Sequence, residues 1–321
     1  MHLKELTYIV TLADEGSITR AADKLYMAQS SLSQFLQQYE AELGLPLFIR
    51  TSKGIRPTAA GTLFIDNART ILTHYRLVQN ELWDMAELNG GSVILGISSF
   101  RGRYMLPKIL THFYEKYPGI RVDIVEQNSM ALEDRLIEGS IDLAIVALPL
   151  TRLTHEVEFI KEDEIFIVAN RNHPVMKFAH KRKNSPYYWV DLKDTAPFEY
   201  ILSDYDTILG STSRRQFQKA GIKPIAYNTN ITADLGVAMA QAGLGLAFTY
   251  HSCAQNDPGT EYLSIGEKGV FLELAIAHPY STYQSKAALA LGKVIKQTFS
   301  PQVPVHSHPV NAPSSQVPVE Q

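Results

Sequence analysis

The chain has 321 residues, of which 45% are hydrophobic, and a formal net charge of −3 at pH 7. This length leaves room for a small domain, a linker and a two-lobed domain, and the hydrophobic content suffices for their cores. No apolar run approaches a membrane span, which excludes an integral helical membrane protein, and the charged segment 3–13 lacks the apolar region of a secretory signal. We therefore expect a cytoplasmic protein with no membrane partner.

The first 43 residues predict three short helices. Apolar residues recur at helical spacing over 3–13 and 18–25, and Gly16 and Ser17 end the first helix and cap the second. The third helix starts at Gln29, and at 100° per residue its apolar and its uncharged polar side chains fall on opposite sides. The polar side can bind base edges in a major groove, since Gln pairs with adenine and Ser both donates and accepts. An ordinary amphipathic surface helix would carry the same residue types.

The segment that follows predicts a β-hairpin. Gly44 fits a helix C-cap, and residues 47–58 suit two short strands with Lys53 and Gly54 at the tip. Three helices and a hairpin predict a winged helix-turn-helix whose basic wing residues meet phosphates, with a solvated hairpin as the alternative. The DNA-contacting residues predicted from the helices and the wing are Arg20, Gln29, Ser30, Ser31, Ser33, Gln34, Gln37, Arg50, Lys53 and Arg56.

The order of these motifs resembles the winged helix-turn-helix of LysR-type transcriptional regulators. The matching elements are A-A-x-x-L, Q-x-x-L-S, E-x-x-L-G-x-x-L-F-x-R and T-x-A-G, carried by Ala21, Ala22, Leu25, Gln29, Leu32, Ser33, Glu40, Leu43, Gly44, Leu47, Phe48, Arg50, Thr58, Ala60 and Gly61. Ala28 departs from the Ser or Thr that often opens the third helix, and Lys53 replaces a usual second wing Arg. The resemblance implies a regulator that binds double-stranded promoter DNA as a dimer or tetramer and that can contact RNA polymerase.

Residues 59–89 form the predicted linker. Over 59–88 there is no Pro, and apolar residues alternate at spacings of four and three, at Phe64, Ala68, Ile71, Tyr75, Val78, Leu82 and Met85. This heptad spacing predicts a helix roughly 40 Å long, which a small winged domain cannot cover. We expect it to pair with a second copy through Phe64, Ile71, Tyr75, Val78 and Leu82. Packing on the chain's own C-terminal region is the alternative, and the family resemblance implies the dimer.

The remaining chain alternates strand-like and helical segments. Predicted strands cover 93–98, 120–126, 142–148, 166–170, 199–202, 245–250 and 271–277, and predicted helices cover 106–117, 131–139, 211–220, 232–242 and 283–299. Such alternation indicates an α/β fold with a parallel sheet, here in two lobes that resemble periplasmic binding proteins. The predicted fold is thus an all-α winged helix-turn-helix, a long linker helix and a two-lobed α/β domain. Its bounds are 1–58 for the head, 59–89 for the linker, 90–164 and 267–300 for lobe I, 165–266 for lobe II and 301–321 for a disordered tail.

Ligands of open α/β sheets bind beyond the carboxyl ends of the strands, where helix N-termini point. The residues predicted to line this effector cleft are Ser98, Ser99, Phe100, Arg101, Gln127, Asn128, Ser129, Ala147, Leu202, Ser203, Thr249 and Tyr250, with Asp204 also at a strand end. Hydroxyls and helix N-termini favour a small anion, and the family resemblance makes a carboxylate the usual effector. The alternatives are that Ser129 caps a helix, that Ser98 ends a strand, and that Arg101 and Arg103 are solvated surface residues.

The sequence contains none of the local signatures of the common hydrolases, metalloproteases or nucleotide-binding loops, and no paired cysteines. We therefore predict no enzyme activity, no catalytic residues, no metal and no cofactor, and expect the lone Cys253 to be buried and structural. The rival interpretation is a small-molecule binding protein without sequence-specific DNA function.

Overall fold

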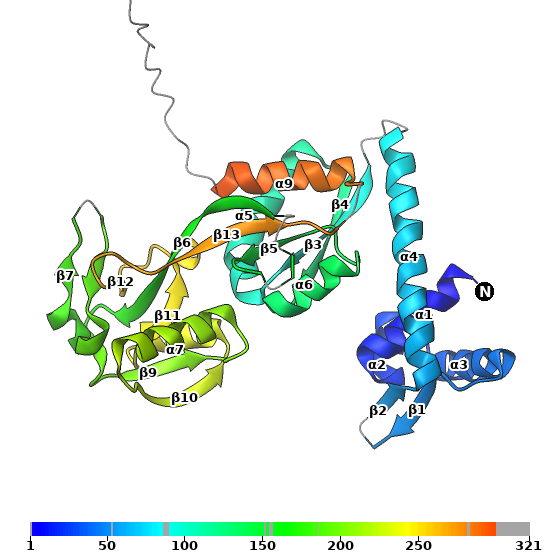
Figure 1. The fold of residues 1–321 in the computed structure, drawn as a ribbon, viewed down its shortest axis with the longest axis horizontal. Coiled ribbons are helices and arrows are strands. Elements are labelled where there is room, and N and C mark those ends of the chain that lie inside the picture. Colours follow the sequence, from blue (N-terminus) through cyan, green and yellow to red (C-terminus); the bar gives the residue numbers. More distant parts are fainter. Residues whose placement is uncertain are drawn as a thin grey trace, which may run out of the picture.

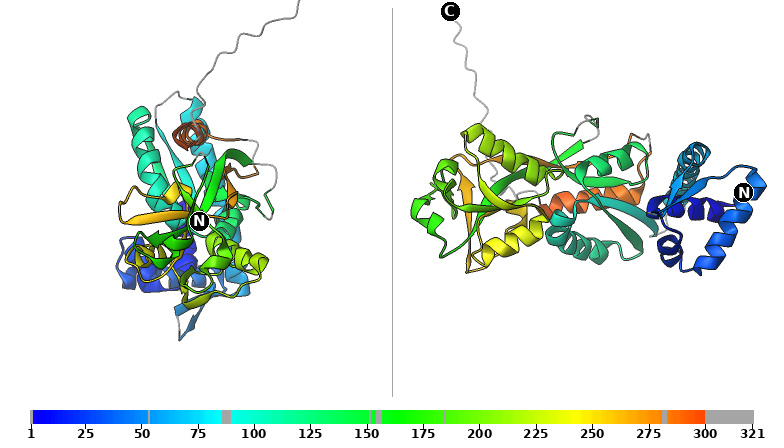
Figure 2. Two further views of the ribbon diagram at one scale, coloured as in Figure 1. Left: turned by 90° about the vertical axis from the view of Figure 1, so that its left-hand side faces the viewer. Right: turned by 90° about the horizontal axis from the view of Figure 1, so that it is seen from below.

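The computed structural model describes residues 2–52, 54–85, 90–150, 152–153, 157–183, 185–280 and 283–299. The molecule is elongated, with a helical head at one end and an α/β region at the other (Figures 1 and 2). The predicted tail 301–321 and the wing residue Lys53 lie outside the described residues. None of the described helices combines the length and the apolarity needed to cross a membrane.

The head consists of three helices and a hairpin, as predicted. Its elements are α1 (Leu3–Glu15), α2 (Ile18–Lys24), α3 (Gln29–Leu43), β1 (Phe48–Thr51) and β2 (Gly54–Pro57), the two strands being antiparallel. Gly16 ends α1 and Gly44 ends α3 with left-handed backbone, at φ 57° and 71°. Ser17 caps α2 by accepting a hydrogen bond from the Arg20 backbone, whereas the Ala28 side chain supplies no cap to α3.

A long helix, α4 (Ala59–Met85), leaves the head and passes lobe I (Figure 1). Its first turns complete the head core, where Ile65 is buried and the Phe64 ring lies 5.8 Å from the Tyr39 ring. Gly61 lets α4 pass close to the backbone at Leu47, because any Cβ at position 61 would overlap the Leu47 carbonyl oxygen.

Gly61→Ala should therefore destabilise the head. Overpacking against backbone costs about 1–3 kcal/mol, so calorimetry of the full chain should show the head unfolding at a lower temperature. Gly292→Ala is the matched control, since that helical glycine would place its Cβ 3.9 Å from the nearest atom, Ile276 Cδ1. If the Gly61 variant and wild type had equal melting temperatures, the close approach of α4 to the Leu47 backbone would not be required for stability.

The far half of α4 is fastened to lobe I by polar contacts. Arg76 Nη1 donates to Asp142 Oδ2 at 2.7 Å and Arg76 Nη2 donates to the Gly139 carbonyl at 2.9 Å. Farther along, the Tyr283 hydroxyl and the Lys286 backbone N–H donate to Asp84 Oδ2 at 2.6 and 3.0 Å. The linker of this chain therefore docks on its own lobe I through a polar face.

The heptad-spaced apolar side chains that are predicted to pair with a second copy form a seam along α4. This seam lies on a different side of the helix from Arg76 and Asp84. Tyr75, Val78 and Leu82 are 47%, 51% and 59% exposed, so in this chain they do not pack on the C-terminal region. Phe64, in contrast, belongs to the head core, which limits the exposed seam to the part of α4 that begins at Ile71.

Lobe I contains a sheet with the order β4-β3-β5-β13-β6. Its elements are β3 (Gly91–Ile97), α5 (Ser99–Lys116), β4 (Ile120–Glu126), α6 (Ser129–Ile137), β5 (Leu143–Ala147), β6 (Val157–Asn170), β13 (Phe271–Ala277) and α9 (Lys286–Phe299). Strands β4, β3 and β5 are parallel, as predicted, and β13 is antiparallel to β5 and β6. Helix α5 starts at Ser99 rather than at the predicted 106, because its first inward residue, Arg101, is a buried charge that gives no apolar periodicity.

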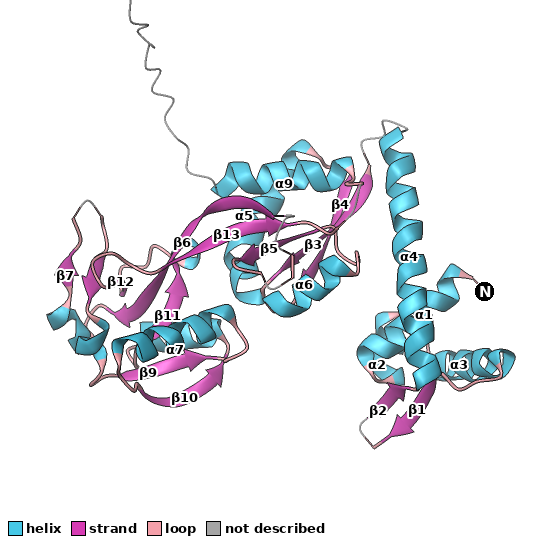
Figure 3. Cartoon of the chain, viewed as in Figure 1, coloured by secondary structure: helices cyan, strands magenta, loops and turns pink. Residues whose placement is uncertain are grey.

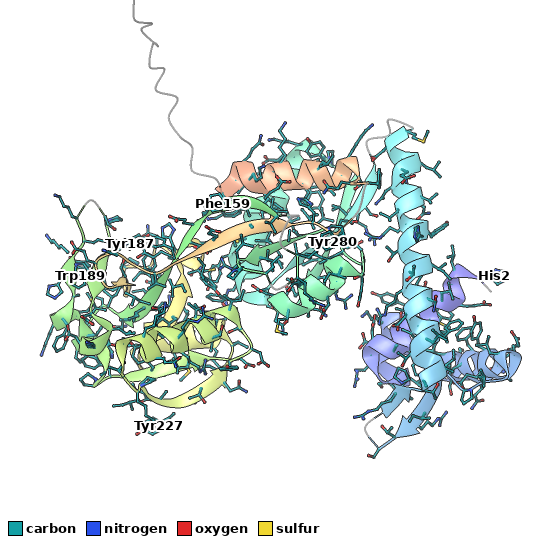
Figure 4. All side chains as sticks on the ribbon, in the orientation of Figure 1. His2, Phe159, Tyr187, Trp189, Tyr227 and Tyr280 are labelled. Atoms are coloured by element: carbon teal, nitrogen blue, oxygen red, sulfur yellow. The ribbon has the colours of Figure 1, made fainter. Side chains whose placement is uncertain are left out.

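Lobe II is built on the far half of β6. Its elements are η1 (Pro174–Phe178), β7 (His180–Lys181), β8 (Tyr188–Val190), η2 (Leu192–Thr195), β9 (Glu199–Ser203), α7 (Ile208–Ala220), β10 (Ile225–Ile231), α8 (Ala233–Gln241), β11 (Ala247–Tyr250), η3 (His251–Cys253) and β12 (Thr260–Ile265). Strand β6 pairs with β13 in lobe I and with β11 and β12 in lobe II, so the two lobes share it (Figure 3). The sequence did not predict β10, whose mostly exposed residues include Tyr227 at 80% exposure (Figure 4).

Candidate functional site

The outward face of α3 presents the predicted reading residues. Gln29, Ser30, Ser31, Gln34 and Gln37 are exposed, and Ser33 is half-buried. The opposite face packs into the head core through Leu32, Leu36 and Tyr39. This arrangement leaves a row of uncharged donors and acceptors free along one helix.

The wing and the turn before α3 flank this face. Arg50 and Arg56 are exposed on the paired strands of the hairpin. Tyr26, which the sequence did not single out, adopts φ 53° in the turn between α2 and α3 and is 97% exposed. Its left-handed backbone lets the chain reverse between the two helices without a glycine.

Two acidic side chains at the end of α1 are paired with cations. Asp14 forms an ion pair with Arg69, and Glu15 accepts from Lys24 Nζ at 2.7 Å. The Lys24 hydrogen bond and charge, together with Arg20, hold the pKa of Glu15 below its usual value despite desolvation. Arg20 also donates to the Glu15 backbone carbonyl, so this predicted DNA contact lies in an ion-pair cluster at the head surface.

Other residues of the family-like motif hold the head together. Glu40 Oε1 accepts from the backbone N–H groups of Leu47 and Phe48 at 2.6 and 2.9 Å, which ties α3 to the wing. Thr58 Oγ1 donates to the Pro46 carbonyl at 2.7 Å and accepts from the Gly61 N–H at 2.9 Å. These residues position the reading helix relative to the wing.

A cavity of about 340 Å³ lies between the two lobes. Its lining residues are Ser98, Ser99, Phe100, Arg101, Gln127, Asn128, Ser129, Asp204, Thr207, Ile208, Leu209, Asn230, Ile231, Thr232, Ala233 and Tyr250. Four helices begin at this cavity, α5 and α6 from lobe I and α7 and α8 from lobe II. Because a helix N-terminus carries partial positive charge and free N–H groups, their convergence favours an anionic ligand.

Three of the four N-cap side chains are used by their own helices. Asn128, Thr207 and Thr232 accept from the backbone N–H groups of Ala131, Gly210 and Leu235. Ser98 makes no such capping bond, which leaves its hydroxyl for a ligand. The interpretation of Ser129 as a cap is wrong, because Asn128 caps α6 and Ser129 is its first helical residue.

Arg101 is buried at the inner end of the cavity, not solvated as one interpretation held. It forms an ion pair with Asp163, and its guanidinium lies 3.7 Å from the centre of the Tyr250 ring. Ser252 also binds Asp163, through its backbone N–H and its hydroxyl, both at 2.8 Å. Burial disfavours the charged form of Asp163, but Arg101 and Ser252 outweigh it and lower the pKa of the carboxyl. Arg101 Nη2 is buried and has no hydrogen-bond partner within the described residues.

Further contacts join the lobes beside the cavity. Arg103 of α5, which is largely exposed, pairs with Asp234 of α8 at 3.1 Å, and the Tyr104 hydroxyl donates to the same carboxylate at 3.3 Å. Burial and Asp234 raise the pKa of Tyr104 to about 12, so this phenol stays a donor at neutral pH. The contacts of Asp234 depend on how the lobes are closed.

Eight of the twelve predicted cleft residues line the cavity, namely Ser98, Ser99, Phe100, Arg101, Gln127, Asn128, Ser129 and Tyr250. Ala147, Leu202, Ser203 and Thr249 do not line it and are buried in the lobes. They end or nearly end their strands, but alternate strand residues face opposite sides, and these side chains are enclosed. Thr207 and Thr232 were missed. Thr232 opens the predicted helix 232–242, whereas Thr207 caps α7 four residues before the predicted start of that helix, since α7 begins at Ile208 rather than 211.

Two further observations concern metal and thiol chemistry. Within the described residues, no group of three or more His, Cys, Asp or Glu side chains is placed to hold a metal ion. Cys253 is buried, as predicted, and burial raises the pKa of its thiol to about 12. Such a thiol is inert at neutral pH.

A winged helix-turn-helix joined by a long helix to a two-lobed cleft defines a regulator that carries its DNA-binding and ligand-binding domains in one chain. Two family models agree with this class: "Bacterial regulatory helix-turn-helix protein, lysR family" matches residues 3–62, and "LysR substrate binding domain" matches residues 86–300. The chain therefore belongs to the LysR family of DNA-binding transcriptional regulators, and its relatives are regulators, not enzymes.

Individual relatives agree over nearly the whole length. The chain is 26% identical over 327 residues to the uncharacterized HTH-type transcriptional regulator YcgK of Bacillus subtilis, covering 93% of this chain and 96% of the relative. It is 29% identical over 306 residues to a probable RuBisCO transcriptional regulator of Nostoc sp., covering 93% and 88%.

Solved structures show the same fold. CbnR, a LysR family transcriptional regulator, superposes with a TM-score of 0.65 at 19% identity, over 94% of this chain and all of CbnR. Full-length CbnR in complex with its target DNA gives 0.64 at 20% identity, over 93% of this chain and all of CbnR. A full-length OxyR variant from Pseudomonas aeruginosa gives 0.61 at 24% identity, over 92% of this chain and 98% of that OxyR variant.

Proposed function

We propose that this regulator binds promoter DNA as a dimer, or as a tetramer assembled from dimers, and that a small anionic metabolite in the interlobe cleft changes that binding. The main support for this proposal is that a single chain combines two features. It has an exposed row of polar side chains on α3 and a cavity at which four helices begin. Contact with RNA polymerase is a further part of the proposal.

In the proposed complex, α3 enters the major groove. Gln29, Ser33 and Gln37 present amides and hydroxyls to base edges, while Arg50 and Arg56 of the wing meet the phosphates. The exposed seam of α4 supports a dimer, since two heads joined by their linkers address two half-sites related by approximate dyad symmetry.

Helix α6 offers a physical connection between the cleft and the linker. Its N-terminal residues Asn128 and Ser129 line the cavity, and just past its C-terminal end Gly139 accepts a hydrogen bond from Arg76 of α4. A ligand that changes lobe closure would displace α6 and, through Arg76, the linker. To shift the equilibrium tenfold, the ligand must favour one state by about 1.4 kcal/mol.

The direct experiment is binding of the full chain to its own upstream DNA at two salt concentrations, with footprinting. We expect a salt-sensitive footprint over spaced, dyad-related half-sites. Sequence-independent binding by a folded protein would favour a small-molecule binding protein without specific DNA function.

Gln29→Ala and Ser33→Ala test the reading face. Each lost base contact should weaken specific binding by about 1–3 kcal/mol, while binding to scrambled DNA changes little. Gln218→Ala, at an exposed position on α7 of lobe II, is the matched control and should leave both affinities unchanged. Unaltered discrimination between operator and scrambled DNA in the Gln29 and Ser33 variants would show that α3 does not read bases through this face.

A further inference from the structure

The interlobe cavity is electrically asymmetric. On the lobe I side it has the Ser98 hydroxyl, which does not cap α5, the start of α5 and Arg101, whose buried Nη2 has no partner within the described residues. On the lobe II side it has Asp204, and no other carboxylate is among its described lining residues. Helix N-termini thus lie on both sides of the cavity, but only the lobe I side adds a guanidinium and only the lobe II side adds a carboxylate.

Asp204 is held in place by its surroundings. Its backbone N–H donates to the Ile231 carbonyl at 3.1 Å, and its own carbonyl accepts from Thr207 Oγ1 at 2.7 Å. Gly210 packs so closely that a Cβ there would overlap the Asp204 carbonyl oxygen. The backbone of Asp204 is therefore fixed in position, and its side chain lies at the cavity wall.

The Asp204 carboxylate accepts hydrogen bonds but has no ion-pair partner among the described residues. The Asn230 amide nitrogen donates to its two oxygens at 2.9 and 3.2 Å, and the Asp206 N–H donates to Oδ1 at 3.1 Å. No Lys, Arg or His of the described residues forms an ion pair with it. A half-buried carboxylate without a direct ion pair disfavours a second anionic group beside it and favours a ligand that brings a positive donor.

We propose that the effector is an aminocarboxylate, with its carboxylate bound near Ser98 and Arg101 and its ammonium group bound to Asp204. This inference rests on the proposed effector function and narrows its ligand class. The apolar middle of the ligand would contact Phe100, Ile208 and Tyr250, which line the same cavity. A dicarboxylate would place a second negative charge against Asp204.

The test uses the full chain and matched pairs of compounds. Thermal shift and calorimetric titration would compare α- and ω-amino acids with the same acids lacking the amino group, each at millimolar concentration, and with succinate and glutarate. We expect at least one aminocarboxylate to bind ten-fold or more tightly than its amine-free counterpart. Asp204→Asn, which keeps the shape and removes the charge, should abolish that preference.

Asp206→Asn is the matched control, because Asp206 is exposed, two residues along the chain and absent from the cavity wall. It should keep the preference. Equal or tighter binding of the amine-free acids to wild type, or a preference that survives in Asp204→Asn, would overturn the aminocarboxylate while leaving an anion effector. Failure of every compound of both classes would overturn the inference together with the proposed anion site.

Discussion

Asp163→Ala should be among the most destabilising single substitutions in the two-lobed region, costing about 3–5 kcal/mol of unfolding free energy. The side chains of Arg101 and Asp163 are only 4% and 0% exposed, so removal of the carboxylate leaves a buried, unpaired guanidinium. Urea unfolding of the full chain should show the loss, and the lobes should become more open to proteolysis because Ser252 of lobe II also binds Asp163.

The control for this prediction replaces both charges. Arg101→Met with Asp163→Leu removes the pair without leaving an orphan charge, and should recover much of the stability lost in Asp163→Ala. Wild-type stability of the single variant would mean that Arg101 finds another partner or reaches water.

The same pair contributes a defined pH dependence. Because the pKa of Asp163 is lowered in the folded protein, its stabilising contribution is present above the unfolded-state pKa of about 3.9 and is lost as the pH falls through the folded-state value. Asp163→Ala should therefore show a flatter stability profile than wild type below about pH 4.

Leu82→Asp should convert the protein to a monomer at micromolar concentration and weaken operator binding about 10²–10⁴-fold. The exposed seam of Tyr75, Val78 and Leu82 would carry a charge into the helix pair, and each head would then bind its half-site alone. Analytical ultracentrifugation and footprinting of the same preparation measure the two effects.

The matched control is Thr70→Asp, which adds the same charge at an exposed position of α4 outside the seam. It should remain dimeric. A dimeric Leu82→Asp protein would place the interface elsewhere, and a monomer that kept full operator affinity would show that dimerisation is not needed for binding.

Local sequence signals predicted the head and the linker well. Gly16, Ser17 and Gly44 mark helix ends because left-handed backbone and hydroxyl caps are properties of a few adjacent residues. The three-four spacing of apolar residues likewise gave the long helix α4 directly. The motif residues Glu40, Thr58 and Gly61 carried the family resemblance, although their contacts with the wing and its flanks became visible only in the fold.

The cleft was predicted in outline and corrected in detail. The rule that ligands bind past strand ends located Ser98, Ser99, Asn128 and Ser129, but it also selected buried residues such as Thr249. Strand β10, which contributes Asn230 and Ile231, was missed because its exposed polar residues show no apolar alternation. The periodicity of apolar residues indicates which face of a helix or strand is buried. It gives no signal for an element such as β10, most of whose residues are exposed.

By itself, the sequence determined the elements of the head, the linker helix, the strand–helix alternation of lobe I, the family and the uncharged face of α3, because these depend on residues only a few positions apart. Only the tertiary structure decided that Arg101 is buried against Asp163, which lies 62 residues away in the chain, and that Asp204 faces the same cavity from the other lobe. Ion pairs and the polarity of a cavity depend on which distant segments of the chain come into contact. A local sequence pattern does not contain that information.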